Sequence, residues 1–118
     1  ALLHRGGPAY VPQPKRSPHE AVALIHEAGG IAGLAHPSEL VEKTLPERLL
    51  AAEPFDGIEV WHPSADARAQ AHWLALAKEH GLLVSGGSDF HGIPDRFPTK
   101  LGIWQVQYVD VKGVIEWK

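Results

Sequence analysis

The chain has 118 residues, of which 44% are hydrophobic and 21% are charged, and its formal net charge is −3. These values are typical of one soluble globular domain and argue against an extended basic surface for nucleic acid. Because the chain has no cysteine, disulfides and thiolate metal sites are excluded, and any metal must be held by histidines and carboxylates. No apolar run approaches the roughly 18 residues of a membrane span, and we predict a cytoplasmic protein without membrane contact.

The first predicted helix follows a turn-rich segment, residues 1–16. We expect Ser17 to cap this helix, Pro18 to occupy its first position and Glu20 to complete a capping box. Apolar residues then recur at helical spacing and predict the buried face: Ala21, Leu24, Ile25 and Ala28. A pair of glycines is expected to end the helix.

Apolar runs of strand character occupy residues 31–36 and 57–61 and begin again at residue 82. Unbroken apolar strands are typical of a parallel sheet that is covered on both faces. A helix is expected between each pair of strands, over residues 39–52 with a break before Pro46, and then up to Gly81. The inward residues of the second of these helices are predicted to be Ala71, Leu74 and Ala77.

The C-terminal part of the chain is harder to interpret. Residues 101–108 predict a fourth strand, whereas residues 109–118 fit a helix or a strand equally well.

The tripeptide His-Pro-Ser begins at His36 and again at His62, each time after an apolar strand and before a helix. One further step of the same length leads to Asp89 and His91. Three successive strands are therefore expected to present these four side chains at their carboxyl ends. Parallel α/β folds bind ligands and carry out catalysis at that edge.

Asp89 and His91 would point the same way if the third strand persisted to its end. Carboxylate and imidazole together suit zinc, manganese or iron, although a plain turn with an exposed His91 would also explain the pattern. For His36 the ligand interpretation is favoured, because strand-to-helix punctuation does not require imidazole. For His62 the two interpretations are equally balanced. Glu59 alternates to the opposite face of its strand and is interpreted as structural.

Four segments of the chain resemble the C-terminal part of PHP (polymerase and histidinol phosphatase) domain proteins, in particular the bacterial metal-dependent phosphoesterases. They are GGPAYVP at 6–12, SPHEAVALIHEAGGIAGLAHP at 17–37, DGIEVWHPS at 56–64 and GLLVSGGSDFHG at 81–92. The resemblance implies an α/β fold: the C-terminal half of a distorted (βα)₇ barrel, with mainly parallel strands and flanking helices. Residues 1–118 would then be a partial PHP domain, because the family's N-terminal half with its His-x-His strand has no counterpart in this sequence.

The resemblance also implies a site with two or three divalent metal ions. His36, Asp89 and His91 match the family's metal ligands, and Arg5 and His62 match residues that would contact phosphate. The implied activity of the intact parent protein is metal-dependent hydrolysis of a small phosphorylated substrate, such as a phosphate monoester or a nucleotide. The 118 residues alone are expected to be inactive, and no general base can be named.

Two other hypotheses stay open at this point. The chain could be an inactive fragment with a structural or partner-binding role. A start codon at Ala1 would favour this hypothesis, whereas an in-frame upstream His-x-His strand would favour the enzyme. An amidohydrolase-like hydrolase would share barrel and metals, but the SDFHG and AYVP motifs argue against it. A half-barrel would expose sheet edges, and we expect these edges either to self-associate with a second copy or to be covered by a missing segment.

Overall fold

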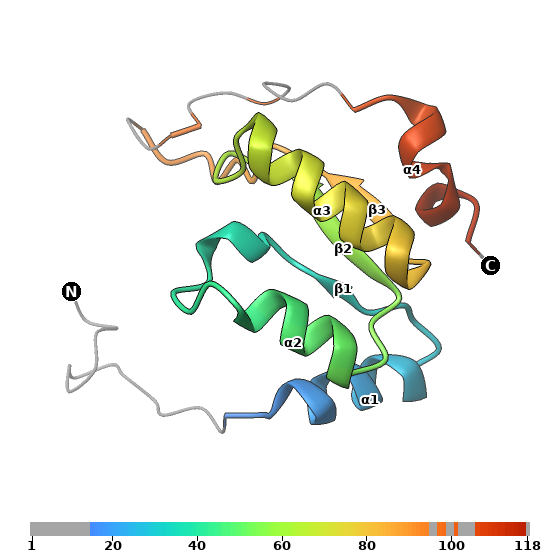
Figure 1. Cartoon of the computed structure of the whole chain (residues 1–118). Coiled ribbons are helices and arrows are strands. Elements are labelled where there is room, and N and C mark those ends of the chain that lie inside the picture. The colour runs from blue at the N-terminus through green and yellow to red at the C-terminus, as the bar shows by residue number, and fades with distance from the viewer. Residues whose placement is uncertain (1–14, 95–96, 99–100, 102–105, 118) are drawn as a thin grey trace.

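A parallel sheet forms the centre of the computed structural model, which describes residues 15–94, 97–98, 101 and 106–117 (Figure 1). The strands are β1 (Gly33–Leu34), β2 (Gly57–Trp61) and β3 (Leu83–Gly86), in the order β1-β2-β3, and both neighbouring pairs are parallel. The helices are α1 (Pro18–Glu27), the 3-10 helix η1 (Pro37–Glu39), α2 (Leu45–Ala52), α3 (Ala67–His80) and α4 (Tyr108–Ile115). The predicted α/β class with parallel strands is therefore confirmed.

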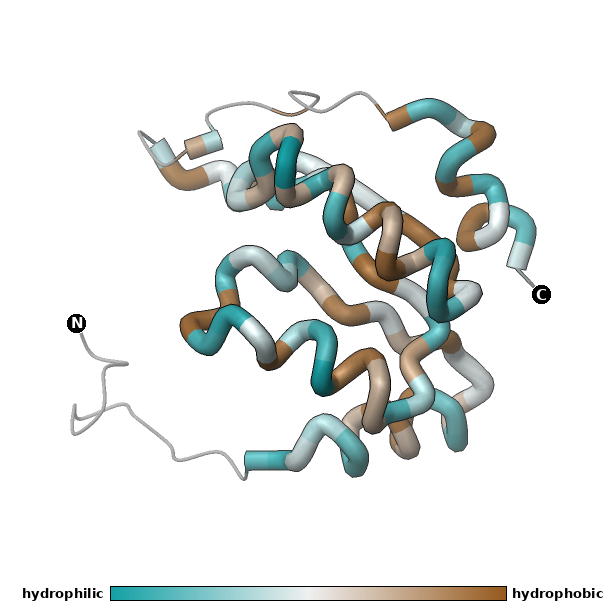
Figure 2. The backbone as a smooth tube through the Cα atoms, in the orientation of Figure 1, coloured by the Kyte–Doolittle hydropathy of each residue, from teal (hydrophilic) through white to brown (hydrophobic). Residues whose placement is uncertain are grey.

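The hydrophobic core lies between the sheet and the helices α2 and α3, which Figure 1 shows on the same face. Parallel strands need a crossover connection, and both connections here carry helices that return over this face. The buried residues of the core are Leu50, Ile58, Val60, Ala65, Trp73 and Ala77. Figure 2 shows hydrophobic residues along the strands, whereas hydrophilic residues predominate on the outer turns of the helices.

Local capping explains where the helices begin. The Ser17 hydroxyl accepts a hydrogen bond from the Glu20 backbone N–H at 3.1 Å, as predicted for α1. The helix expected over residues 39–52 is shorter than predicted, because α2 begins only at Leu45. Pro46 then lies in the first helical turn, where its missing N–H leaves no hydrogen bond unmade.

The predicted buried faces of α1 and α3 are partly wrong. In α1 the buried residue is Val22, and Leu24 and Ile25 are exposed. In α3 Ala77 is buried as expected, but Trp73 takes the place that was predicted for Leu74. Helical periodicity shows that a helix has an apolar face, but the neighbouring elements decide which of several apolar residues they cover.

The predicted fourth strand is wrong for the part of residues 101–108 that the structure describes. Leu101 lies in a turn, residues 106 and 107 are irregular, and Tyr108 begins the helix α4; residues 102–105 lie outside the described part. Short apolar runs fit helix and strand alike, so packing decides between them. Here α4 packs against β3, with Gly113 placed where an added Cβ would lie 2.7 Å from a Leu83 methyl group.

Gly86 allows β3 to approach β2 closely at the irregular step in their pairing. A Cβ at this position would lie 2.5 Å from the Trp61 Cβ and 3.1 Å from a Val106 methyl group. We therefore expect Gly86→Ala to lower the free energy of unfolding by about 1–3 kcal/mol, as overpacking does. Gly87→Ala is the matched control, since nothing lies within 4 Å of an added Cβ there. Urea unfolding measures both, and equal stability of the two variants would contradict this packing.

Asp56 ties the end of α1 to the start of β1. Its Oδ2 accepts hydrogen bonds from the Ala32 backbone N–H and from the His26 ring Nε2, each at 2.7 Å. Burial raises the pKa of Asp56, but the hydrogen bonds from Ala32 and His26 outweigh burial and hold the pKa below its ordinary value of 3.8.

A carboxyl with a lowered folded-state pKa stabilises the fold above its unfolded-state pKa and loses this effect as pH falls through the folded-state value. The stability advantage of the wild type over Asp56→Asn should therefore be full at pH 6 and disappear below the ordinary pKa of 3.8. Urea unfolding at a series of pH values measures this advantage. If the stability difference between the wild type and Asp56→Asn did not change with pH, the charge of Asp56 would not contribute to the stability of the fold.

In the described part of the chain, no helix is long and apolar enough to cross a bilayer. Self-association through the sheet edges stays a prediction.

Candidate active site

Four side chains meet where the parallel strands end, and we call them the strand-end cluster: His36, His62, Asp89 and His91. The ring centres of His36 and His62 are 5.0 Å apart. The Asp89 Oδ2 lies 3.0 Å from the His62 Nε2, and its Oδ1 lies 3.7 Å from the His91 Nδ1. The prediction that these residues share one edge of the sheet is confirmed.

Two members of the cluster have unusual backbone conformations. Among the described residues other than glycine, those with positive φ are His36, at 27°, and Asp89, at 52°. Asp and His are among the residues that adopt such angles most readily, yet the conformation typically costs about 1–3 kcal/mol and gathers at functional sites.

The third strand does not persist to Asp89 as the sequence argument assumed, because β3 ends at Gly86. Asp89 and His91 lie instead in an irregular segment after β3, in which the His91 Nδ1 lies 2.6 Å from the Asp89 carbonyl oxygen.

In both His36 and His91, the ring Nδ1 faces an oxygen that can only accept a hydrogen bond. The His36 Nδ1 lies 3.1 Å from a carboxylate oxygen of Glu39, and the His91 Nδ1 lies against the Asp89 carbonyl. Because a carbonyl oxygen only accepts, the proton of the neutral His91 ring is on Nδ1, and the nearby carboxylate of Glu39 favours the same tautomer of His36; each Nε2 then keeps its lone pair. Histidines that bind metal ions almost always donate their second ring N–H in this way.

His62 has the opposite arrangement and is 3% exposed. Its Nδ1 accepts the Ser64 backbone N–H at 3.0 Å and lies 2.8 Å from the Ser64 hydroxyl. Because a backbone N–H can only donate, the proton of the neutral ring is on Nε2, which donates to Asp89. Both ring nitrogens of His62 are therefore engaged.

Asp89 carries the negative charge at the centre of the cluster. The hydrogen bond from His62 lowers the pKa of Asp89, partial burial opposes this, and the nearby imidazoles of His91, His62 and His36 lower the pKa further. The carboxylate is therefore ionised at neutral pH, as a metal ligand must be.

The donor chemistry of the cluster fits a divalent cation. Imidazole nitrogens and a carboxylate are ligands that zinc, manganese and iron accept. In the part of the chain that the structure describes, no group of three or more histidine or carboxylate side chains is arranged so that it could hold a metal ion as it stands. The ligand roles of His36, Asp89 and His91 thus stay a prediction that the chemistry supports.

Sequence reasoning missed a contact of Glu59. Its Oε1 accepts a hydrogen bond from the His36 backbone N–H at 2.9 Å, across the β1–β2 pair. A useful signal was present, because Glu59 is the only charged residue in the apolar strand 57–61. Arg5, the other predicted phosphate contact, lies outside the described residues.

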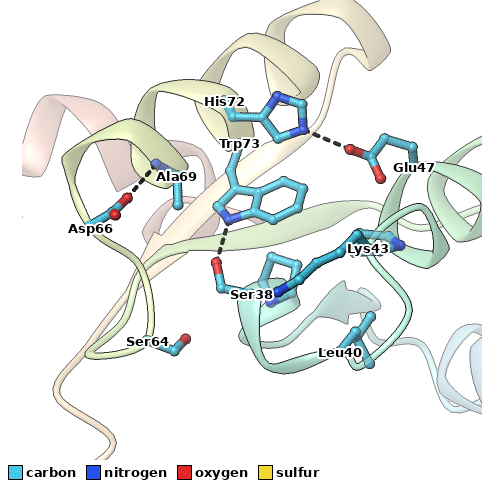
Figure 3. A pocket seen from close by; sticks show the side chains of 11 residues that line it. Ser38, Leu40, Lys43, Glu47, Ser64, Asp66, Ala69, His72 and Trp73 are labelled. Carbon is cyan, nitrogen blue, oxygen red and sulfur yellow. Dashed lines mark hydrogen bonds and ion pairs between the residues drawn. The ribbon is translucent and has the colours of Figure 1, made fainter.

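Two pockets open beside the cluster. A pocket of about 250 Å³ is lined by Glu39, His62, Pro63, Ser64, Asp89, Phe97 and Pro98. A second pocket, of about 340 Å³, lies between the η1–α2 segment and α3 and shares Ser64 with the first (Figure 3). In its wall the Trp73 indole donates to the Ser38 hydroxyl at 2.9 Å, and His72 pairs with Glu47 at 2.7 Å. Because these polar groups are already paired with one another, we interpret this wall of the second pocket as structural.

A parallel α/β sheet with imidazoles and an ionised carboxylate at its strand ends is typical of metal-dependent hydrolases. No protein-family model matches the chain. Several curated proteins nevertheless match the chain in sequence. A 3',5'-nucleoside bisphosphate phosphatase from Chromobacterium violaceum is 40% identical over 93 residues, covering 75% of this chain and 33% of that protein.

Two other relatives have related names. The 5'-3' exoribonuclease Rnm of Escherichia coli is 40% identical over 94 residues, or 75% of this chain and 32% of that protein. A phosphoribosyl 1,2-cyclic phosphate 1,2-diphosphodiesterase from Eggerthella lenta is 38% identical over 79 residues, or 67% of this chain and 30% of that protein. The matches thus span about a third of the length of these relatives.

Solved structures agree with the sequence relatives. A protein from Bifidobacterium adolescentis, described as a metal-dependent phosphoesterase, matches with a TM-score of 0.59 and 34% identity over 79% of this chain and 35% of that one. An amidohydrolase from Chromobacterium violaceum, solved with bound sulfate and no metal, matches with a TM-score of 0.59 and 40% identity over 75% of this chain and 33% of that one. The homologues of this chain are PHP-type phosphoesterases, the family that its motifs resemble, and the matches cover only part of the chain.

Proposed function

We propose that this chain is the C-terminal part of a metal-dependent phosphoesterase that hydrolyses a phosphate ester of a ribose-containing compound, such as a nucleotide. The observation that carries the proposal is the strand-end cluster, in which His36 and His91 have the protonation pattern of metal ligands around an ionised Asp89. The names of the curated relatives share a ribose-linked phosphate: a nucleoside bisphosphate, a phosphoribosyl cyclic phosphate and RNA.

The proposal includes the fold of the parent protein. Residues 1–118 would be a partial PHP domain, namely the C-terminal half of a distorted (βα)₇ barrel. The sequential order β1-β2-β3 of parallel strands, with helices in the connections, supports this. The strand-end cluster would then lie at the carboxyl end of the barrel, where such folds place their active sites.

His36 and His91 would offer their Nε2 atoms, and Asp89 its carboxylate, to zinc, manganese or iron. When bound, such ions stabilise charge on the phosphate and make a coordinated water more acidic. In the reaction a water oxygen forms a bond to phosphorus, the P–O bond to the ribose oxygen breaks, and the leaving alcohol receives a proton. Arg5 would bind phosphate oxygens through its guanidinium; His62 was the second residue expected to contact phosphate, but Ser64 and Asp89 engage both of its ring nitrogens.

Bound sulfate in one structural neighbour supports a site for a tetrahedral oxyanion in this family. The rival hypothesis, an inactive fragment kept for a structural role, is not favoured, because the curated relatives are named as phosphatases, diphosphodiesterases and exoribonucleases.

The test is phosphate release from a nucleoside 3',5'-bisphosphate by the complete protein that the gene encodes, with added manganese or zinc. We expect turnover that a chelator abolishes and that His36→Ala lowers by orders of magnitude. Residues 1–118 alone are expected to turn over little or no substrate, because loss of even one metal removes several kcal/mol of charge stabilisation.

His80→Ala is the matched control, because His80 is an exposed histidine at the end of α3, away from the strand ends. Activity that resisted the chelator, or that His80→Ala reduced as strongly as His36→Ala, would contradict the proposal.

A further inference from the structure

The central strand β2 lies between the two strands whose ends carry the candidate ligands. One side chain in the middle of β2 reaches the end of β1, and another, directly after β2, reaches the segment that follows β3. Glu59 contacts the β1 side, and His62, which directly follows Trp61 at the end of β2, contacts the β3 side.

Glu59 holds the turn that carries His36. Its Oε1 accepts the His36 backbone N–H at 2.9 Å, at a residue whose φ is 27°. A residue in this sparsely populated region persists only when its surroundings hold it there. Glu59 also lines a small hollow with residues of β1 and β3, on the face of the sheet opposite to α2 and α3.

His62 holds the Asp89 carboxylate in the same way. The ring is 3% exposed, and its Nε2–H donates to the Asp89 Oδ2 at 3.0 Å. Ser64 fixes which nitrogen carries the proton, because the Ser64 backbone N–H donates to the His62 Nδ1. Asp89 has a φ of 52°, so this candidate ligand, like His36, has a strained backbone conformation, and His62 is its rigid hydrogen-bond partner.

The same contacts argue against His62 as a ligand or as a direct phosphate contact. Its Nδ1 is an acceptor for Ser64, and its only proton is shared with Asp89. A phosphate oxygen would have to displace the carboxylate that the metal needs. By contrast, His36 and His91 keep Nε2 available.

We infer that β2 is the positioning strand of the site: Glu59 holds His36, and His62, oriented by Ser64, holds Asp89. The inference rests on the proposed function, because it assigns these residues to the metal ligands of that site. Residues that hold metal ligands from behind typically change metal affinity by about 10–100-fold when they are replaced.

The test compares pairs of variants that keep or lose one hydrogen bond. His62→Gln keeps a side-chain N–H for Asp89, whereas His62→Leu does not. Glu59→Gln keeps an oxygen for the His36 N–H, whereas Glu59→Leu does not. Zinc affinity of the full chain, measured by calorimetry, should fall by about 10–100-fold in the leucine variants and largely recover in the glutamine variants.

Cobalt(II) spectra provide a readout that general loss of stability would not change. The leucine variants should show an altered visible spectrum of the bound ion, and the glutamine variants a spectrum close to wild type. His80→Leu is the control, because it removes an exposed histidine outside the cluster. If leucine and glutamine variants bind zinc alike, the inference is wrong.

A measurement without metal separates this inference from the proposed function. Nitrogen NMR of the metal-free chain should show the His62 proton on Nε2, and Glu59→Leu should speed hydrogen exchange of the His36 amide at least tenfold. If the wild-type chain bound zinc no more tightly than His36→Ala, the proposed metal binding would be wrong. If NMR placed the His62 proton on Nδ1, or if Glu59→Leu left the exchange rate of the His36 amide unchanged, the positioning role would be wrong.

Discussion

Asp89→Asn is expected to lower the zinc affinity of the chain by more than about 100-fold, beyond the range seen for residues that only hold ligands. The substitution removes the negative charge that three imidazoles surround, and Asn cannot supply it. Asn tolerates a positive φ as well as Asp does, so the turn at residue 89 should keep its shape. Zinc titration by calorimetry, with circular dichroism to confirm folding, measures the effect.

Asp66→Asn is the matched control for this charge change. Asp66 caps α3 through a hydrogen bond to the Ala69 N–H at 2.8 Å, and Asn caps helices equally well. Zinc affinity should therefore be unchanged in this variant. Equal losses in both variants would mean that net charge, and not the carboxylate of Asp89, controls binding.

Trp73→Ala is expected to lower the free energy of unfolding by about 3–5 kcal/mol, as is typical of a large aromatic side chain in a core. Trp73 is 6% exposed, packs in the core with Ile58 and Val60, and donates its indole N–H to Ser38. A small domain has only about 5–15 kcal/mol of stability in total, so the variant should be close to unfolding. Urea unfolding followed by circular dichroism measures the change.

Leu74→Ala is the control on the same helix, and it distinguishes the observed packing from the face that periodicity predicts. Leu74 is 38% exposed, whereas Trp73 is 6% exposed, so the loss should be only about 1–2 kcal/mol, because less apolar area leaves contact with the core. A larger loss for Leu74→Ala than for Trp73→Ala would mean that α3 buries the other face.

The meeting of His36, His62, Asp89 and His91 could be predicted from the sequence. Each follows an apolar strand at a regular interval, and the carboxyl ends of parallel strands must lie at one edge of the sheet. Strand pairing then brings residues far apart in the chain within a few ångströms of one another, without any detail of side-chain packing. The family motifs pointed to the same residues independently.

The roles within the cluster could not be predicted in the same way. His36 and His62 stand in the same His-Pro-Ser tripeptide, yet their ring nitrogens are protonated oppositely. The difference comes from which acceptor or donor lies next to each Nδ1: Glu39 beside His36 and the Ser64 backbone beside His62. The contact of Glu59 with the His36 backbone N–H could not be predicted either, because strand alternation gives the face of a side chain but not the backbone group that it reaches.

The sequence by itself determined the parallel α/β class, the positions of its strands and the residues at their ends, because hydrophobic pattern and strand direction are local properties of the chain. The tertiary structure alone decided that α3 buries Trp73, that residues 108–115 form a helix against β3, and that Glu59 and His62 contact residues at the ends of β1 and β3. Each of these outcomes depends on which groups from distant segments come into contact, and the period of a local pattern carries no information about its neighbours.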